Sequence, residues 1–132
     1  MTLIKSKKRA KELGEVYTPN SLVEEMTNQI EKSYWSLDKT IFESSCGNGN
    51  FLTVILEKKI KESKDILGSL KTIYGVDIME DNIKEARCRM LQVCFDNGLS
   101  LEDSKTAVEI LKKNIIVGNT LKDKSLFENH ML

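Results

Sequence analysis

The chain has 132 residues, of which 40% are hydrophobic and 30% are charged, and its 20 basic and 20 acidic residues give a formal net charge of zero. This length suits one domain with a single core, and the composition excludes disorder along the whole chain. A net charge of zero also argues against a protein that binds nucleic acid by bulk charge, so any nucleic-acid contact must be local.

Cysteine and histidine usage narrows the class of protein further. The cysteines are Cys46, Cys88 and Cys94, an odd number without C-x-x-C spacing, and the one histidine is His130. These counts argue against a disulfide framework and a metal site. No segment approaches the roughly eighteen apolar residues of a membrane span, and no apolar stretch follows the N-terminal lysines. We therefore expect a protein of a reducing cytoplasm.

The N-terminal segment is basic and is followed by a helical pattern. Residues 1–13 form an arm that contains Lys5, Lys7, Lys8, Arg9 and Lys11. We interpret this arm as a solvated or disordered lead-in, with contact to DNA phosphates as the alternative. Apolar residues then recur at helical spacing, namely Leu22, Val23, Met26 and Ile30. Ser21 with Glu24 matches a capping box, so a helix is predicted after Pro19.

A strand, a turn and a second helix come next. Residues 40–46 are a β-prone run, and two glycines, Gly47 and Gly49, follow it. This combination predicts a strand followed by a tight turn. The spacing of apolar residues returns to helical from Phe51 onward, and residues 64–72 are interpreted as a loop or a frayed helix end.

The second half of the chain continues this alternation. Residues 72–78 are a continuous apolar run, which predicts a strand buried on both faces. Residues 80–97 have helical spacing, with Asn97 and Gly98 as the C-terminal cap. Ser100 with Asp103 marks the start of another helix, and residues 114–119 predict a third strand. Strands joined by helices form parallel sheets through right-handed crossovers, so we predict an α/β fold with a three-stranded parallel sheet and helices on its faces.

Two features of this fold point to a nucleoside ligand. Gly47 and Gly49 follow the first strand, where the main chain can approach a ligand at the start of the next helix. Asp77 ends the second strand, where an acid accepts hydrogen bonds from both ribose hydroxyls. Each feature has a simpler interpretation: a G-x-G sequence occurs in many turns, and Asp77 or Asp81 could cap the following helix. Asp77 lies 30 residues after Gly47. Dinucleotide-binding proteins place the acid about 20 residues on, which disfavours a nicotinamide-dependent dehydrogenase.

Four segments in this order resemble the N6-adenine-specific DNA methyltransferases of bacterial restriction-modification systems, which use S-adenosylmethionine. They are the G-E-V-Y-T-P sequence at residues 14–19, E-S-S-C-G-N-G-N-F-L at 43–52, Y-G-V-D-I at 74–78 and I-I-V-G-N-T-L at 115–121. The second segment departs from the family pattern D-P-A-C-G-S-G-N-F-L at its first three residues. The resemblance implies a Rossmann-like methyltransferase fold, of which residues 14–132 would form the cofactor-binding part.

The resemblance also implies a set of cofactor-binding residues. They are Tyr17, Thr18, Pro19, Glu43, Cys46, Gly47, Gly49, Phe51, Asp77, Ile78, Asn119 and Leu121. In the family, the acid after the second strand holds the ribose and the next apolar residue packs on the adenine. The main-chain N–H groups after the glycines suit the methionine carboxylate. The Phe51 ring would help to wall the pocket, a role compatible with packing of helix against sheet, whereas Asn119 could equally be a turn residue.

The family's catalytic tetrapeptide, (Asp/Asn)-Pro-Pro-(Tyr/Phe), is not found in this sequence, in which Pro19 is the only proline. We therefore expect no catalytic residue here, and expect that a second polypeptide completes the sheet beside the first strand, or that the chain forms a homodimer at that edge. DNA methylation would then require the partner. The alternative is a non-catalytic module that binds cofactor or partner, such as a mobile-element remnant or a regulator of restriction-modification.

Overall fold

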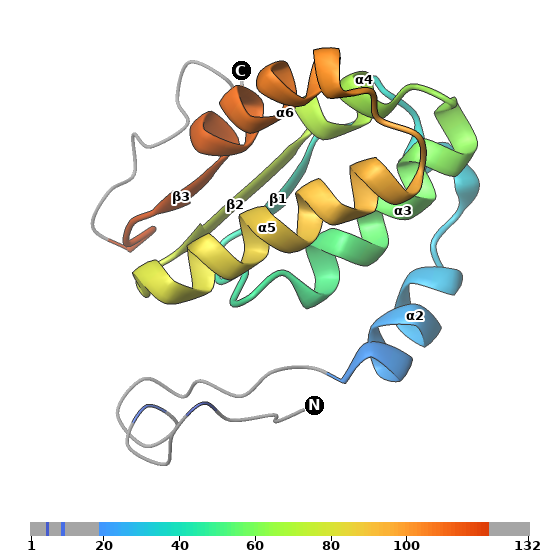
Figure 1. Cartoon of the computed structure of the whole chain (residues 1–132). Coiled ribbons are helices and arrows are strands. Elements are labelled where there is room, and N and C mark those ends of the chain that lie inside the picture. Colours follow the sequence, from blue (N-terminus) through green and yellow to red (C-terminus); the bar gives the residue numbers. More distant parts are fainter. Residues whose placement is uncertain (1–4, 6–8, 10–18, 122–132) are drawn as a thin grey trace.

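Three short parallel strands lie at the centre of the molecule in the order β1-β2-β3 (Figure 1). They are β1 (Ile41–Glu43), β2 (Ile73–Asp77) and β3 (Ile115–Val117). The structure is a computed structural model, and it describes Lys5, Arg9 and residues 19–121. In the register of the sheet, Glu43 lies beside Gly75 and Asp77 lies beside Val117. The carboxyl ends of the strands therefore meet at one edge.

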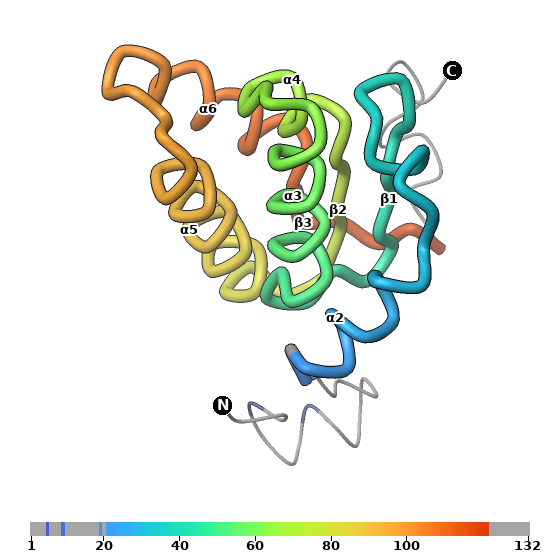
Figure 2. Tube along the Cα trace, turned by 90° about the vertical axis from the view of Figure 1, so that its right-hand side faces the viewer, coloured from blue at the N-terminus to red at the C-terminus, as the bar shows by residue number. Residues whose placement is uncertain are grey.

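Helices connect and cover the strands, so the predicted α/β class is confirmed. They are α2 (Asn20–Asn28), the 3-10 helix η1 (Lys32–Trp35), α3 (Asn50–Ser63), α4 (Ile66–Lys71), α5 (Glu80–Asp96) and α6 (Leu101–Asn114). Figures 1 and 2 show α3 and α5 on the same face of the sheet. This placement follows from the strand order, because two right-handed crossovers that advance in the same direction put both helices on one side.

The C-terminal end of α5 and the N-terminal end of α6 are set by the residues that the sequence indicated. Gly98 has a φ of 101° and its N–H donates to the carbonyl of Phe95, while the N–H of Leu99 donates to that of Cys94. This pair of hydrogen bonds is a Schellman cap. The hydroxyl of Ser100 accepts a hydrogen bond of 3.1 Å from the N–H of Asp103. Both predicted caps are confirmed, and the chain reverses between the two helices.

Residues 64–72, predicted as a loop or a frayed helix end, contain the separate helix α4. The signal that sequence reasoning missed is Asp65, whose carboxylate accepts a hydrogen bond of 2.8 Å from the N–H of Gly68. A side-chain cap stabilises a short helix by satisfying one of its N–H groups.

The predicted helix after Pro19 is present, but its details differ. The N-terminal residue is capped by no side chain, so the capping box predicted from Ser21 and Glu24 does not form. The helix ends at Asn28, before Ile30, and of the predicted apolar face only Val23 is buried. The apolar pattern was correct for a helix, but tertiary packing covers only one narrow side of α2.

Strand β2 is buried on both faces, as its sequence predicts. On the helical face, Ile73 packs in the main hydrophobic core with residues of α3, α5 and α6. On the opposite face, Tyr74 and Val76 form a second cluster with Ile116. Among the helices of the described ranges, none has the length and apolar character needed to cross a membrane.

Candidate functional site

The candidate site lies at the carboxyl edge of the sheet, where the turn after β1 meets the end of β2. The N–H of Cys46 donates a hydrogen bond of 2.9 Å to the carbonyl of Val76. The turn at residues 44–49 therefore stays beside β2 instead of leaving the sheet. As a result, Gly47 and Gly49 lie on the same edge as Asp77, which the sequence only suggested.

Two glycines in this region are required by the geometry. Gly49 has a φ of 93°, and a Cβ at this position would lie 3.2 Å from the Cα and the Cβ of Ala86. A Cβ at Gly75 would lie 2.7 Å from the Cδ1 of Leu52. Gly49 thus allows the turn to pack on α5, and Gly75 allows α3 to pack on β2. Both contacts bring the start of α3 close to the end of β2.

The start of α3 is suited to an anionic group. The first N–H groups of a helix lack partners within the helix and carry a partial positive charge. The residue before α3 is Gly49, which has no side chain to cap these groups. A carboxylate or phosphate of a ligand would be stabilised there.

Asp77 presents a fixed carboxylate at the end of β2. Its Oδ1 accepts a hydrogen bond of 3.2 Å from the N–H of Met79, and its Oδ2 accepts one of 2.9 Å from the Nδ2 of Asn82. Each carboxylate oxygen can accept two hydrogen bonds, so each retains acceptor capacity for a ligand. The N-cap position of α5 is occupied by Met79, and no side chain caps the helix from that position. Asp77 is therefore not the side-chain cap of α5, the simpler interpretation of its position.

The residues proposed to surround an adenine lie at this edge with different environments. Ile78 is 47% exposed next to Asp77, and its apolar side chain is not used by the core. The N–H of Gly118 donates to the carbonyl of Asp77, which brings Asn119 near the end of β2. The Oδ1 of Asn119 accepts a hydrogen bond of 3.0 Å from the N–H of Leu121, itself 86% exposed. Asn119 thus acts as a turn residue here, and its adenine contact stays a prediction.

Burial raises the pKa of two groups beneath the site. Burial raises the pKa of the Cys46 thiol to about 12, and the Asp77 and Glu43 carboxylates add to this increase. Cys46 is therefore a neutral thiol with no character of a nucleophile. Burial also raises the pKa of Glu43, with a hydrogen bond from the backbone of Ser45 acting in the opposite direction.

The remaining predicted residues have mixed outcomes. Phe51 is partly buried and packs against the hydrophobic core, so the packing interpretation applies to it. Pro19 precedes α2, and its carbonyl accepts hydrogen bonds from the N–H groups of Leu22 and Val23. Tyr17 and Thr18, together with Lys7, Lys8 and Lys11 of the basic arm, lie outside the described residues.

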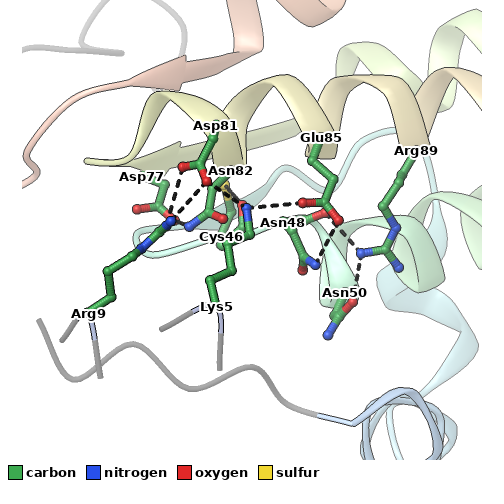
Figure 3. A network of polar contacts seen from close by, with 11 residues as sticks. Lys5, Arg9, Cys46, Asn48, Asn50, Asp77, Asp81, Asn82, Glu85 and Arg89 are labelled. Atoms are coloured by element: carbon green, nitrogen blue, oxygen red, sulfur yellow. Dashed lines mark hydrogen bonds and ion pairs between the residues drawn. The ribbon is translucent and has the colours of Figure 1, made fainter. Parts of the chain in front are cut away.

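A polar network beside the glycine turn was not predicted from the sequence (Figure 3). The guanidinium of Arg89 donates to the carbonyl of Asn48 at 3.0 Å and to the Oδ1 of Asn50 at 2.7 Å. The Nδ2 of Asn48 donates to Glu85 at 3.2 Å. One signal in the sequence could have indicated this network: Asn82, Glu85 and Arg89 are spaced so that they share one face of a helix.

Two residues of the basic arm also reach this edge. Lys5 forms ion pairs of 3.0 Å with Asp81 and 3.1 Å with Glu85, and the guanidinium of Arg9 lies 2.9 Å from Asp81 (Figure 3). Hydrogen bonds from Arg9, and then from Lys5, hold the pKa of Asp81 well below its ordinary value. The expectation of a solvated arm is therefore wrong for Lys5 and Arg9, because carboxylates of α5 compensate their charges.

The geometry thus combines an anion-binding helix start, a carboxylate suited to a diol and an exposed apolar side chain. This combination suits a nucleoside that carries an anionic group. Comparisons with curated proteins and with solved structures found no significant match. A model of the family described as N-6 DNA Methylase matches residues 3–129. Since this match spans nearly the whole chain, the protein belongs to the N-6 DNA methylase family.

Proposed function

We propose that this chain binds S-adenosylmethionine at the carboxyl edge of the sheet, as the cofactor-binding part of a site-specific DNA adenine-N6 methyltransferase. The observation that carries the proposal is the Asp77 carboxylate, held by two hydrogen bonds at the same edge as the glycine turn and the start of α3. Membership of the N-6 DNA methylase family supports this ligand class.

Each part of the cofactor has a counterpart among the residues of the edge. Asp77 would accept hydrogen bonds from the two ribose hydroxyls, and the exposed side chain of Ile78 would cover one face of the adenine. The start of α3, after Gly49, would hold the methionine carboxylate. When bound, the cofactor supplies a methyl group on a sulfonium, which is already activated for transfer. The contribution of this chain is therefore binding and orientation, and proton transfer by Cys46 is not required.

The proposal includes a partner for the methylation of DNA. Target adenines are flipped out of the duplex and must be held by a pocket of their own. No (Asp/Asn)-Pro-Pro-(Tyr/Phe) loop is present in the 132 residues, so we propose that a second polypeptide supplies it, with the chemistry taking place in the cytoplasm. DNA contact through the arm would rest mainly on Lys7, Lys8 and Lys11, since Lys5 and Arg9 pair with acidic groups.

The same absence of this loop also favours a second candidate function. A chain without a catalytic loop can act as a non-catalytic module that binds cofactor or partner, for example a regulator of restriction-modification. Methyl transfer to DNA, measured with labelled cofactor for the chain alone and then with the product of the neighbouring gene, separates the candidates. Methylation only with the partner supports the enzyme subunit. Cofactor binding without methylation in either assay favours the module.

Calorimetric titration with S-adenosylmethionine tests the site itself. We expect Asp77→Ala to weaken binding by ~1–3 kcal/mol, as for the loss of charge-assisted hydrogen bonds. Asp96→Ala is a matched control, because Asp96 is an exposed acid at the opposite end of α5. Equal affinities of Asp77→Ala and the wild type would show that the ligand does not use this edge. A wild type that binds no cofactor would contradict the proposed function as a whole.

A further inference from the structure

Helix α5 directs polar side chains at both halves of the candidate site. Asn82, Glu85 and Arg89 are three and then four residues apart, so they share one face of the helix. Figure 3 shows them turned toward Asp77 and the glycine turn. The sequence-based interpretation of this helix used only its apolar residues, and the family match does not distinguish these polar positions.

Asn82 is the most unusual member of this row. It is fully buried, with a relative exposure of 0%, although asparagine is usually found at the surface. Its Nδ2 donates a hydrogen bond of 2.9 Å to the Oδ2 of Asp77. A buried amide is tolerated when hydrogen bonds replace its contacts with water. The amide of Asn82 therefore holds the carboxylate of Asp77 from the protein side.

The other two members hold the glycine turn in a similar way. Arg89 fixes the carbonyl of Asn48 and the side chain of Asn50, and Glu85 accepts from the amide of Asn48. Asn48 lies 30 residues before Ile78 in the sequence. The loops that contain these two residues need no direct side-chain bond to each other, because side chains of α5 contact both regions. The rigid backbone of α5 sets the separation between the glycine turn and the Asp77 carboxylate.

We propose that Asn82 is a positioning residue, which orients the Asp77 carboxylate so that its remaining lone pairs face the ribose of the cofactor. The inference rests on the proposed function and adds a residue to that same site. Without Asn82, the N–H of Met79 is the one partner that residues 19–121 still offer the Asp77 carboxylate, and the side chain can rotate. A ligand must then immobilise the carboxylate itself, which reduces affinity.

A double-mutant cycle tests this inference. S-adenosylhomocysteine is titrated into the wild type, Asn82→Ala, Asp77→Ala and the double variant. We expect Asn82→Ala to weaken binding roughly 3- to 10-fold, the effect of releasing one side chain. In the Asp77→Ala background, we expect the Asn82→Ala substitution to change affinity little, because its action passes through Asp77.

A matched control separates positioning from simple loss of stability. Asn114 is also a buried asparagine, and its Nδ2 donates to the carbonyl of Lys71 at the opposite edge of the sheet. We expect Asn114→Ala to lower the melting temperature but to bind S-adenosylhomocysteine like the wild type. If Asn82→Ala does not fold, Asn82→Ser takes its place in the same cycle, with the same expected result.

The outcomes distinguish failure of this inference from failure of the proposed function. A wild type that binds while Asn82→Ala binds equally well would overturn the positioning role alone. Fully additive effects of Asn82→Ala and Asp77→Ala would overturn it as well, because they would show that Asn82 acts independently. A wild type that binds neither S-adenosylmethionine nor S-adenosylhomocysteine would overturn the proposed function, and the positioning role with it.

Discussion

At the scale of single residues, Glu43 shows how the site places a charge in an unfavourable position. This carboxyl group ends β1, is partly buried and lies at the edge where the ligand is proposed to bind. Burial raises its pKa above the ordinary value of 4.5, since the charged form loses solvation. At a pH above its raised pKa, Glu43 is a carboxylate in the folded state, although this charged form is better solvated in the unfolded chain.

This shift gives a pH-dependent prediction for Glu43→Gln. Because the pKa of Glu43 is raised in the folded state, the folded state binds more protons than the unfolded state as the pH rises above 4.5. The free energy of unfolding therefore falls over this pH range. We expect Glu43→Gln to raise the melting temperature at neutral pH by roughly 1–4 °C, and the gain to disappear below the ordinary pKa. Thermal denaturation across this pH range is the measurement, with the exposed Glu109→Gln as the control. A gain that persists at acidic pH would contradict the explanation.

At the scale of elements, a buried lysine joins α3 to the segment before β1. Lys59 has a relative exposure of 0%, and its Nζ donates hydrogen bonds to the carbonyls of Ser36 at 3.1 Å and Lys39 at 2.6 Å. Burial lowers its pKa to about 8, which Asp38 partly opposes. Lysine side chains usually lie at the surface of a helix. Instead, the segment at residues 36–39 folds over it.

We expect Lys59→Met to destabilise the fold by ~1–3 kcal/mol, because the carbonyls of Ser36 and Lys39 lose the donor that Lys59 supplies. Denaturation in urea measures the free energy of unfolding. Lys61→Met provides the control, since Lys61 is exposed and pairs with Glu57 at the surface. Exposed pairs of this kind contribute little stability. Similar losses for both variants would show that Lys59 does not connect these elements.

At the scale of the whole molecule, large apolar side chains of α2 and of β1 are partly exposed. Leu22 and Met26 of α2 are 44% and 47% exposed, and Phe42 of β1 is 40% exposed. Figure 2 shows the segment from α2 running along the side next to β1. Among the described strands, β1 pairs with β2 alone. Exposed apolar side chains beside a sheet edge are typical of a surface that another polypeptide covers.

We therefore expect the purified chain to self-associate, or to bind the polypeptide that completes its sheet. Sedimentation velocity at several concentrations measures the association. Replacing both Leu22 and Met26 by serine should reduce it, because less apolar area is then buried between chains. Leu101→Ser is the control, since Leu101 is 83% exposed on α6. A wild type that remains monomeric and binds no partner would contradict this prediction.

The sequence by itself determined the order of the three strands and of helices α2, α3, α5 and α6, the position of the glycine turn and the placement of Asp77 at a strand end. These features follow from local causes, namely apolar periodicity, turn residues and caps. Tertiary structure alone decided that Asn82 and Lys59 are buried, that Leu22 and Met26 are exposed, and that Lys5 pairs with Asp81. The reason is physical: burial and pairing depend on segments far apart in the chain, which no local pattern records.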